Sequence, residues 1–141
     1  MRWLWEGIFS IDIPDGWRLN EQDEFIEIVP PAPVGAAHLT VLKRTRSGEI
    51  ADGEARLLAA DFARKQGISD PQPTETREAT QAVATISFQT ADAEGPCYWY
   101  VETRVWKGRA VICSYTHGGQ DEASNQIACA IFRSLRPAAA S

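Results

Sequence analysis

Two histidines and three cysteines are the residues of this chain that could carry nucleophilic chemistry. A thiol nucleophile needs a base within hydrogen-bond reach, and Cys113 and His117 are the nearest such pair in the sequence. They fall in one predicted strand, where four residues span about 13 Å, whereas a proton transfer requires roughly 3 Å. His38 could meet Cys97 or Cys129 only through the fold. The spacing therefore predicts no catalytic residue and gives the histidines and cysteines packing roles.

The same residue types lack the spacing of a metal site. The sequence contains no Cys-x-x-Cys pair, no His-x-x-x-His pair and no carboxylate-rich loop with the spacing of a calcium site. The run His117-Gly-Gly-Gln120 is similar to an anion-binding glycine loop, but it has no lysine and is followed by Asp121 and Glu122, which would repel an anion. We expect no metal and no other cofactor.

A long aromatic hairpin is the strongest local pattern in the sequence. Two alternating segments, 98–106 and 109–116, flank Lys107-Gly108, and the glycine can adopt the positive φ of a tight hairpin turn. This register places three residues of the first segment, Val101, Thr103 and Val105, opposite Ser114, Ile112 and Ala110 of the second.

The other face of this hairpin is predicted to be a partner-binding patch. It combines aromatic and charged side chains: Tyr98, Tyr100, Glu102, Arg104, Trp106, Arg109 and Tyr115. Buried charges are rarely tolerated unless they are paired, so the charges favour an exposed face. Trp, Tyr and Arg are also enriched at the energetic centres of protein interfaces. The alternative is that helices cover both faces of the sheet.

The elements that would position this patch are strands and two helices. Alternation predicts strands at 2–6, 8–13, 24–29, 36–45, 74–79 and 82–90, in addition to the hairpin. Helical spacing predicts helices over 51–66 and 120–135. The basic run Lys43-Arg44-Thr45-Arg46 is expected to be a solvated strand end. This order indicates an α+β fold, an antiparallel β-sheet with two main helices packed on it, in a single domain over 1–141.

Both ends of the chain carry motifs. Phe9-Ser-Ile-Asp-Ile-Pro-Asp-Gly-Trp17 predicts a half-buried strand, a turn and a buried tryptophan, and Ile131-Phe-Arg-Ser-Leu-Arg-Pro137 predicts a helix end stopped by proline. With the mid-chain helix and the aromatic hairpin, these motifs resemble the Mog1/PsbP-like family of small α/β domains, which includes DcrB-like bacterial proteins. The resemblance covers roughly 8–137. It departs at Thr80-Gln81-Ala82, where such domains often have a glycine before the strand that precedes the long hairpin.

The resemblance implies a binding protein rather than an enzyme. Its members are not known as enzymes, and one group resembles the effector-associated chaperones of type VI secretion, which are small, acidic and leaderless like this chain. The likeness therefore adds an adaptor or chaperone role to the patch that the residues predict.

Composition and charge narrow the choice of partner. The net charge of -5 and the pI near 5.0 oppose binding to nucleic acid, which requires a basic face. No apolar run of about 18 residues is present, so no membrane span is predicted, and no signal-peptide pattern precedes the first strand. Widely spaced cysteines, odd in number, fit reduced packing residues. We expect a cytoplasmic protein.

These observations predict a non-enzymatic adaptor or chaperone that binds another protein, with a homodimer as a further option. Two alternatives stay open. A small-molecule carrier that uses an aromatic cleft would need a preformed apolar cavity of a few hundred Å³. A hydrolase-type enzyme would need His38 or His117 within hydrogen-bond distance of a carboxylate or a thiol.

Overall fold

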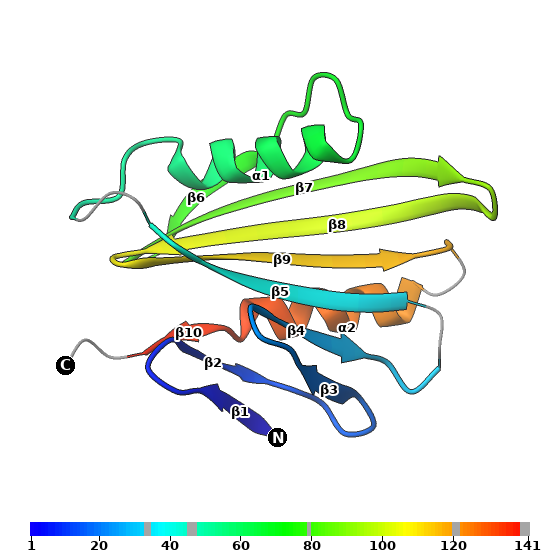
Figure 1. Ribbon diagram of the computed structural model, residues 1–141, viewed down its shortest axis with the longest axis horizontal. Coiled ribbons are helices and arrows are strands. Elements are labelled where there is room, and N and C mark those ends of the chain that lie inside the picture. Colours follow the sequence, from blue (N-terminus) through cyan, green and yellow to red (C-terminus); the bar gives the residue numbers. More distant parts are fainter. Residues whose placement is uncertain (33–34, 45–47, 79, 120–121, 139–141) are drawn as a thin grey trace.

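A large antiparallel sheet organises the structure (Figure 1). This computed structural model describes residues 1–32, 35–44, 48–78, 80–119 and 122–138. Within these ranges the large sheet has seven strands. In spatial order they are β3 (Arg18–Glu21), β4 (Phe25–Val29), β5 (Gly35–Lys43), β9 (Arg109–His117), β8 (Gly95–Trp106), β7 (Gln81–Asp92) and β6 (Thr74–Glu78).

Two helices and a small sheet complete the fold. The small antiparallel sheet has the order β1 (Arg2–Trp5), β2 (Phe9–Asp12) and β10 (Arg136–Pro137). Helix α1 (Glu54–Lys65) packs on one face of the large sheet, against β6, β7 and β8. Helix α2 (Glu122–Arg133) and β2 lie on the other face. The fold class is therefore α+β, with antiparallel sheets and two helices.

The predicted hairpin register is confirmed. Strands β8 and β9 pair so that Val101, Thr103 and Val105 lie opposite Ser114, Ile112 and Ala110. Gly108 in the connecting turn has a φ of 94°, a conformation that side chains with a Cβ rarely adopt. Because one residue of slip would reverse every side chain, this register fixes which residues share a face.

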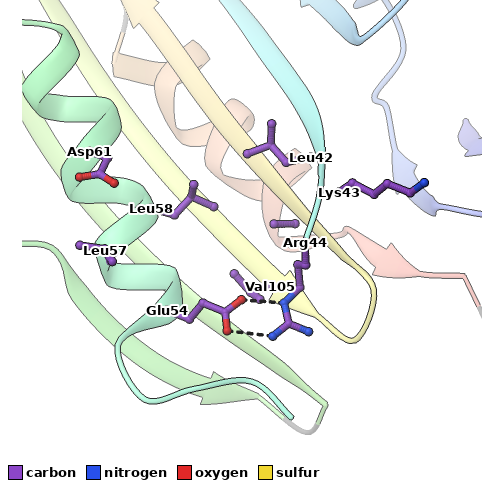
Figure 2. A pocket seen from close by; sticks show the side chains of 9 residues that line it. Leu42, Lys43, Arg44, Glu54, Leu57, Leu58, Asp61 and Val105 are labelled. Atoms are coloured by element: carbon purple, nitrogen blue, oxygen red, sulfur yellow. Dashed lines mark hydrogen bonds and ion pairs between the residues drawn. The ribbon is translucent and has the colours of Figure 1, made fainter. Parts of the chain in front are cut away.

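Helix α1 lies close to the sheet because the contact is made of small residues. Its buried positions are Ala55, Ala59, Ala60 and Ala63, and the first two pack in one cluster with Ala82, Ala84, Val105 and Ala110. The Glu75 carboxylate accepts backbone N–H groups of Gly53 at 3.0 Å and Arg56 at 2.8 Å, which satisfies donors at the helix start. The first turn also lies beside the end of β5 (Figure 2). Helix α1 begins at Glu54, three residues later than predicted.

Helix α2 closes the main core. Its buried residues include Ala128, Ile131 and Phe132, whereas positions 120–121 of the predicted helix lie outside the described residues. The prediction that this helix runs to residue 135 is wrong: it ends at Arg133, and β10 then pairs with β2. Proline at 137 is compatible with a strand this short, because only one of its sides is paired.

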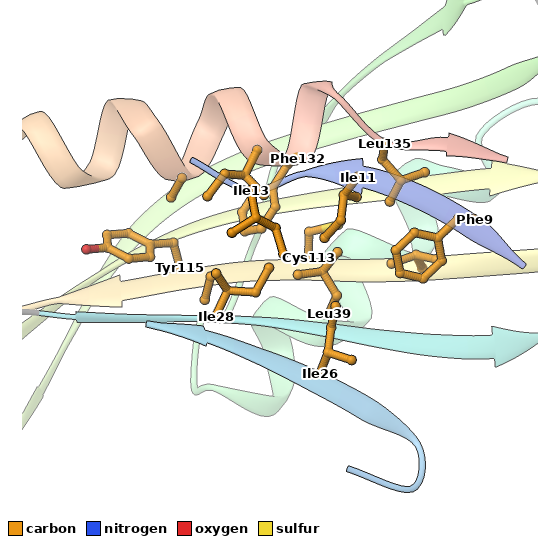
Figure 3. Close-up of a cluster of buried hydrophobic side chains, with 14 of the residues drawn as sticks. Phe9, Ile11, Ile13, Ile26, Ile28, Leu39, Cys113, Tyr115, Phe132 and Leu135 are labelled. Atoms are coloured by element: carbon orange, nitrogen blue, oxygen red, sulfur yellow. The ribbon is translucent and has the colours of Figure 1, made fainter. Parts of the chain in front are cut away.

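The main core lies between the large sheet and the layer formed by α2 and β2 (Figure 3). Phe9, Ile11 and Ile13 meet Phe132 and Leu135 over the central strands. The prediction that Trp17 is buried is confirmed, and its ring lies 6.3 Å from that of Tyr115. Burial of this much apolar surface makes the layer the main source of stability.

Strand β3 is the element of the large sheet that the sequence did not predict. It pairs with β4 through Arg18↔Val29 to Glu21↔Ile26, although only Leu19 on it is apolar. An edge strand needs little apolar character, so its alternation is weak. Within the described ranges, neither helix is long and apolar enough to cross a membrane.

Candidate functional site

The predicted partner-binding patch lies largely inside the core. Strand geometry does place its residues on one face, but Glu102 and Arg104 are each 1% exposed, Trp106 is 7% exposed and Tyr115 is fully buried. The expected exposure of these four residues is therefore wrong. The physical reason is that α2 and β2 cover this face, with Trp106 and Tyr115 in the same apolar cluster as Phe9 and Phe132.

The buried charges are tolerated because they are paired within a hydrogen-bonded row. Arg104 Nε donates to Glu102 Oε2 at 2.7 Å, and Arg104 Nη1 donates to Gln81 Oε1 at 3.1 Å. The Tyr100 hydroxyl donates to Glu102 Oε1 at 2.7 Å. Glu78, half exposed, lies 3.4 Å from Arg104 Nη1. This row satisfies both ends of the ion pair, as buried charges require.

The row also shifts the acidities of its members. Burial, with the nearby Glu102 carboxylate, holds the pKa of Tyr100 well above its usual value. Burial alone would lower the pKa of Arg104, but Glu102 outweighs it and keeps that pKa raised. Both residues therefore retain their protons, and the row stays a neutral phenol beside a paired guanidinium and carboxylate.

The rest of the predicted patch lies at its two ends. Tyr98 is 36% exposed, and its ring stacks on that of His117 at 5.5 Å. Tyr98 and Tyr100 line a hollow of about 340 Å³ beside the first turn of α2. Arg109, at the opposite end, is half-buried. These residues do not form one continuous surface, because the buried row separates them.

The opposite face of the large sheet is covered only in part. Helix α1 packs on β6, β7 and β8, and leaves most side chains of β9, β5 and β4 on that face half-buried. They are Phe25, Glu27, Val29, Ala36, His38, Thr40, Leu42, Ile112 and Thr116. Among the residues that the structure describes, neither helix nor the small sheet packs over this part of the face, which borders a groove along α1.

Part of that groove is an apolar hollow of about 270 Å³ between α1 and β5 (Figure 2). Leu42, Val105 and Ala110 from three strands form its floor, and Leu58 of α1 forms its wall. Leu57, the preceding residue of the helix, is 60% exposed at the rim. An exposed leucine over an apolar floor can contact an apolar ligand or side chain without rearrangement of the fold.

A partly buried ion pair forms one end of this hollow (Figure 2). Arg44 donates from Nε to Glu54 Oε2 at 2.6 Å and from Nη2 to Glu54 Oε1 at 2.8 Å. Its Nη1 donates to the carbonyl of Gly48 at 3.1 Å. The hydrogen bond to Glu54 raises the pKa of Arg44. This bidentate pair ties the end of β5 to the start of α1.

The prediction that Arg44 belongs to a solvated strand end is therefore wrong. Its side chain is 3% exposed, while the neighbouring Lys43 is exposed as expected, and Thr45 and Arg46 lie outside the described residues. The sequence gives only a weak signal for the Arg44–Glu54 pair. Glu54 lies ten residues after Arg44 at the start of the helix, and acidic residues are common at helix starts because they interact favourably with the helix dipole.

One histidine meets a carboxylate. His38 Nε2 lies 3.2 Å from Glu27 Oε2 on the open part of the sheet, and the ring of Phe25 lies 5.8 Å from that of His38. Ser114 is the strand partner of His38 on the same face and is buried. Cys113, in contrast, points into the main core on the other side of the sheet. The sheet therefore separates the His38–Glu27 pair from that thiol.

The three cysteines are free, as predicted from their spacing. Cys113 and Cys129 are buried and Cys97 is half-buried. In the described ranges, no group of three or more His, Cys, Asp or Glu side chains is arranged to hold a metal ion.

Comparison with known proteins bears on the fold. No family model matches the chain, and no curated protein matches it. Among solved structures, it is similar to a crystal structure of a protein from Bacteroides thetaiotaomicron VPI-5482, with a TM-score of 0.62 and 13% sequence identity. The alignment covers 93% of this chain and 45% of that one, so this chain spans less than half of its length. At this identity the likeness shows a shared fold and leaves function open.

Proposed function

We propose that this chain is a non-enzymatic binding module, an adaptor or chaperone, that holds an apolar segment of another protein in the groove beside α1. The observation that carries the proposal is the exposure of Leu57, 60%, directly beside the apolar floor of Leu42, Val105 and Ala110. Exposed apolar surface that adjoins a hollow is typical of interaction sites, because leaving it in water has a free-energy cost.

The charges around the hollow favour a partner segment that is apolar at its centre. Arg44 and Glu54 neutralise each other at one end, and Lys43 and Asp61 contribute opposite charges at the sides. A buried charge on the partner would therefore find no unpaired counter-charge at the Arg44–Glu54 end. One or two large aliphatic or aromatic side chains inserted from an exposed segment fit this lining, in the manner of a groove-bound anchor.

His38 meets the distance requirement of the hydrolase alternative toward a carboxylate but is separated by the sheet from the thiol of Cys113. Its ring pairs with Glu27 on the open part of the sheet, while Cys113 lies on the core side. We propose a positioning role for this pair at the far side of the groove, where it presents polar edges to a bound segment.

Selection of peptides from a random displayed library tests the proposal while the natural partner is unidentified. We expect selected peptides to carry apolar anchors and to shift the amide resonances of Leu42, Leu58 and Ala110. Leu57→Glu should weaken their binding about tenfold or more, since it places a charge at the apolar contact. Ile127→Glu is the matched control, because Ile127 is an exposed apolar residue on α2, 39% exposed. Peptides that map elsewhere, or that bind Leu57→Glu as tightly as wild type, would overturn the proposal.

A small-molecule carrier is the second candidate, and the apolar lining of the hollow favours it. About 270 Å³ is close to the lower limit of ligand pockets. Its lining is aliphatic, which differs from the aromatic cleft that the sequence suggested. Saturable binding of N-phenyl-1-naphthylamine that Leu58→Arg abolishes, with no peptide selected, would favour the carrier over the adaptor.

We also propose that the fold is a distant member of the Mog1/PsbP-like group and that the protein acts in the cytoplasm. The order of the motifs from Phe9 to Pro137 and the three free cysteines support these assignments. A sequence profile built from close homologues tests the first, and fractionation of cells that express the tagged full-length protein tests the second.

A further inference from the structure

One segment of β7 has a free edge. Strand β6 pairs with β7 only from Gln81 to Thr85, whereas β8 pairs with it from Ala82 to Asp92. Among the residues that the structure describes, no strand pairs with 86–92 on the side away from β8. The backbone N–H and C=O groups on that side are therefore available to an added strand.

This free edge lacks the protection that the other edges of the sheet carry. Edge strand β3 has Arg18 and Glu21, and β6 has Glu75, Arg77 and Glu78. In contrast, 86–92 reads Ile-Ser-Phe-Gln-Thr-Ala-Asp, with no proline or glycine and with one charge, Asp92, at its end. Natural edge strands avoid such sequences unless they are paired, because charges and prolines prevent unwanted strand addition.

The side chains of this segment specify what kind of strand fits. On the α1 side, Ile86 and Phe88 are half-buried, and the Phe88 ring stacks on Trp99 at 5.6 Å. On the other side, Ser87 and Gln89 are exposed. An added strand must therefore alternate apolar and polar residues in the same way, since its side chains continue both faces of the sheet. A second copy of 86–92 has this alternation over 86–89, and Thr90, Ala91 and Asp92 complete the segment with small or polar residues.

We propose that two copies of this chain pair antiparallel through residues 86–92 of β7. With the two-fold axis at Gln89, Gln89 lies opposite its own counterpart, Phe88 lies opposite Thr90 of the second copy, and Ile86 lies opposite Asp92. A two-fold contact of this kind is self-complementary. No like charges are opposed in this register, and residues on the same face of each sheet meet one another.

The placement of β6 supports this register. Thr85 is the last residue of β7 that pairs with β6, so the added strand ends where β6 begins. Residues 86–92 of each copy are then paired with the other copy, and β6 keeps its place beside 81–85 in both copies. The pairing lies near the β7–β8 turn, while Leu42, Val105 and Ala110 of the groove lie near the β8–β9 turn. The inference is therefore independent of the proposed function, and the dimer leaves the groove open.

Sedimentation equilibrium of the full chain over a wide concentration range tests the proposal. We expect a monomer–dimer equilibrium for wild type and a dimer dissociation constant about fivefold or more higher for Gln89→Lys, which places two like charges directly opposite each other. Gln126→Lys, the same change at an exposed position of α2, should leave the dissociation constant at the wild-type value. A wild-type chain that stays monomeric at all concentrations, or a Gln89→Lys chain that dimerises as tightly as wild type, would overturn the proposal.

A charge-complementation experiment tests the register itself. Gln89→Lys mixed with Gln89→Glu should form a heterodimer that is tighter than either homodimer, because the opposed charges then attract. Because Gln89 is exposed, both variants should unfold at the wild-type urea midpoint when all three proteins are diluted below the wild-type dimer dissociation constant, which separates loss of pairing from loss of folding. A mixture that associates no better than the separate variants contradicts the two-fold axis at Gln89.

Discussion

At the scale of single residues, the most informative group is the row of Tyr100, Glu102 and Arg104. Burial of an unpaired charge costs several kcal/mol, so the ion pair and its hydrogen bonds offset a penalty that the core otherwise imposes. Such a row adds little net stability. It does, however, require this face of β8 to stay in one register against α2, because every member depends on its neighbours.

Removal of one partner from this row should be strongly destabilising. We expect Arg104→Ala to lower the free energy of unfolding by about 3–5 kcal/mol, because Glu102 is then left buried and unpaired. Arg109→Ala, in the same hairpin, is the control, and its effect should be within about 1 kcal/mol of wild type because Arg109 is half-buried and, among the described residues, donates only to the carbonyl of Gly108. Urea unfolding measures both, and similar losses for the two variants would contradict this description of the row.

The cysteines give a second prediction at this scale. Burial raises the pKa of the Cys113 thiol well above its usual value, and burial also raises the pKa of Cys129, so neither forms the reactive thiolate readily. At about pH 8, iodoacetamide should modify Cys97 first and leave Cys113 unmodified in the native protein. Peptide mass spectrometry reads out each site, and urea-unfolded protein, in which all three react, is the control. Equal native rates at Cys97 and Cys113 would show that the core face is open.

At the scale of elements, the close pairing of β5 and β9 depends on one glycine. A Cβ at Gly35 would overlap the carbonyl of Thr116 and the ring of Tyr115. A larger residue there must push the two strands apart or move Tyr115 out of the core. The start of β5 can therefore lie this close to β9 only because residue 35 has no side chain.

Gly35→Ala should therefore cost about 1–3 kcal/mol of stability, as overpacking of a tight contact does. Gly118→Ala provides a matched control, since nothing lies within 4 Å of a Cβ built there. Thermal unfolding followed by circular dichroism compares the two variants. A Gly35→Ala midpoint equal to that of Gly118→Ala would mean that the strands are less closely paired than the structure indicates.

The elements also show what sequence patterns can establish. The register of β8 and β9 is predictable because the Lys107-Gly108 turn fixes it. The exposure predicted for Glu102 and Arg104 is wrong, because alternation tells which residues share a face and not what covers that face. Their partners come from the same strand and from Gln81, and a pairing at positions two apart has no signature in a strand pattern.

The groove could not be predicted from the sequence for a related reason. Its residues come from β5, α1, β8 and β9, and their apolar character looks like ordinary core until the position of α1 is known. Strand β10 was hidden because two residues are too few to show alternation. Local patterns thus predicted most elements, whereas the site depends on packing between them.

At the scale of the whole molecule, the two faces of the large sheet differ. One face is sealed by α2 and β2 over the main core, and the other is covered by α1 over only part of its width. The face covered by α2 and β2 contains the main core and therefore contributes most of the stability of the fold. The partly covered face carries the hollow beside Leu57, the half-buried side chains of β4, β5 and β9, and the His38–Glu27 pair. We assign binding to this face.

Site-specific photo-cross-linking tests this assignment most directly. A p-benzoylphenylalanine introduced at position 57 reports contacts at the rim of the groove, and the same residue at position 127 of α2 reports contacts on the sealed side. We predict a discrete adduct in cells from position 57 and none from position 127. The dissociation constant of the purified partner should be at least about tenfold higher for Leu57→Glu than for wild type. An adduct only from position 127, or a partner that binds Leu57→Glu as tightly as wild type, would contradict the account.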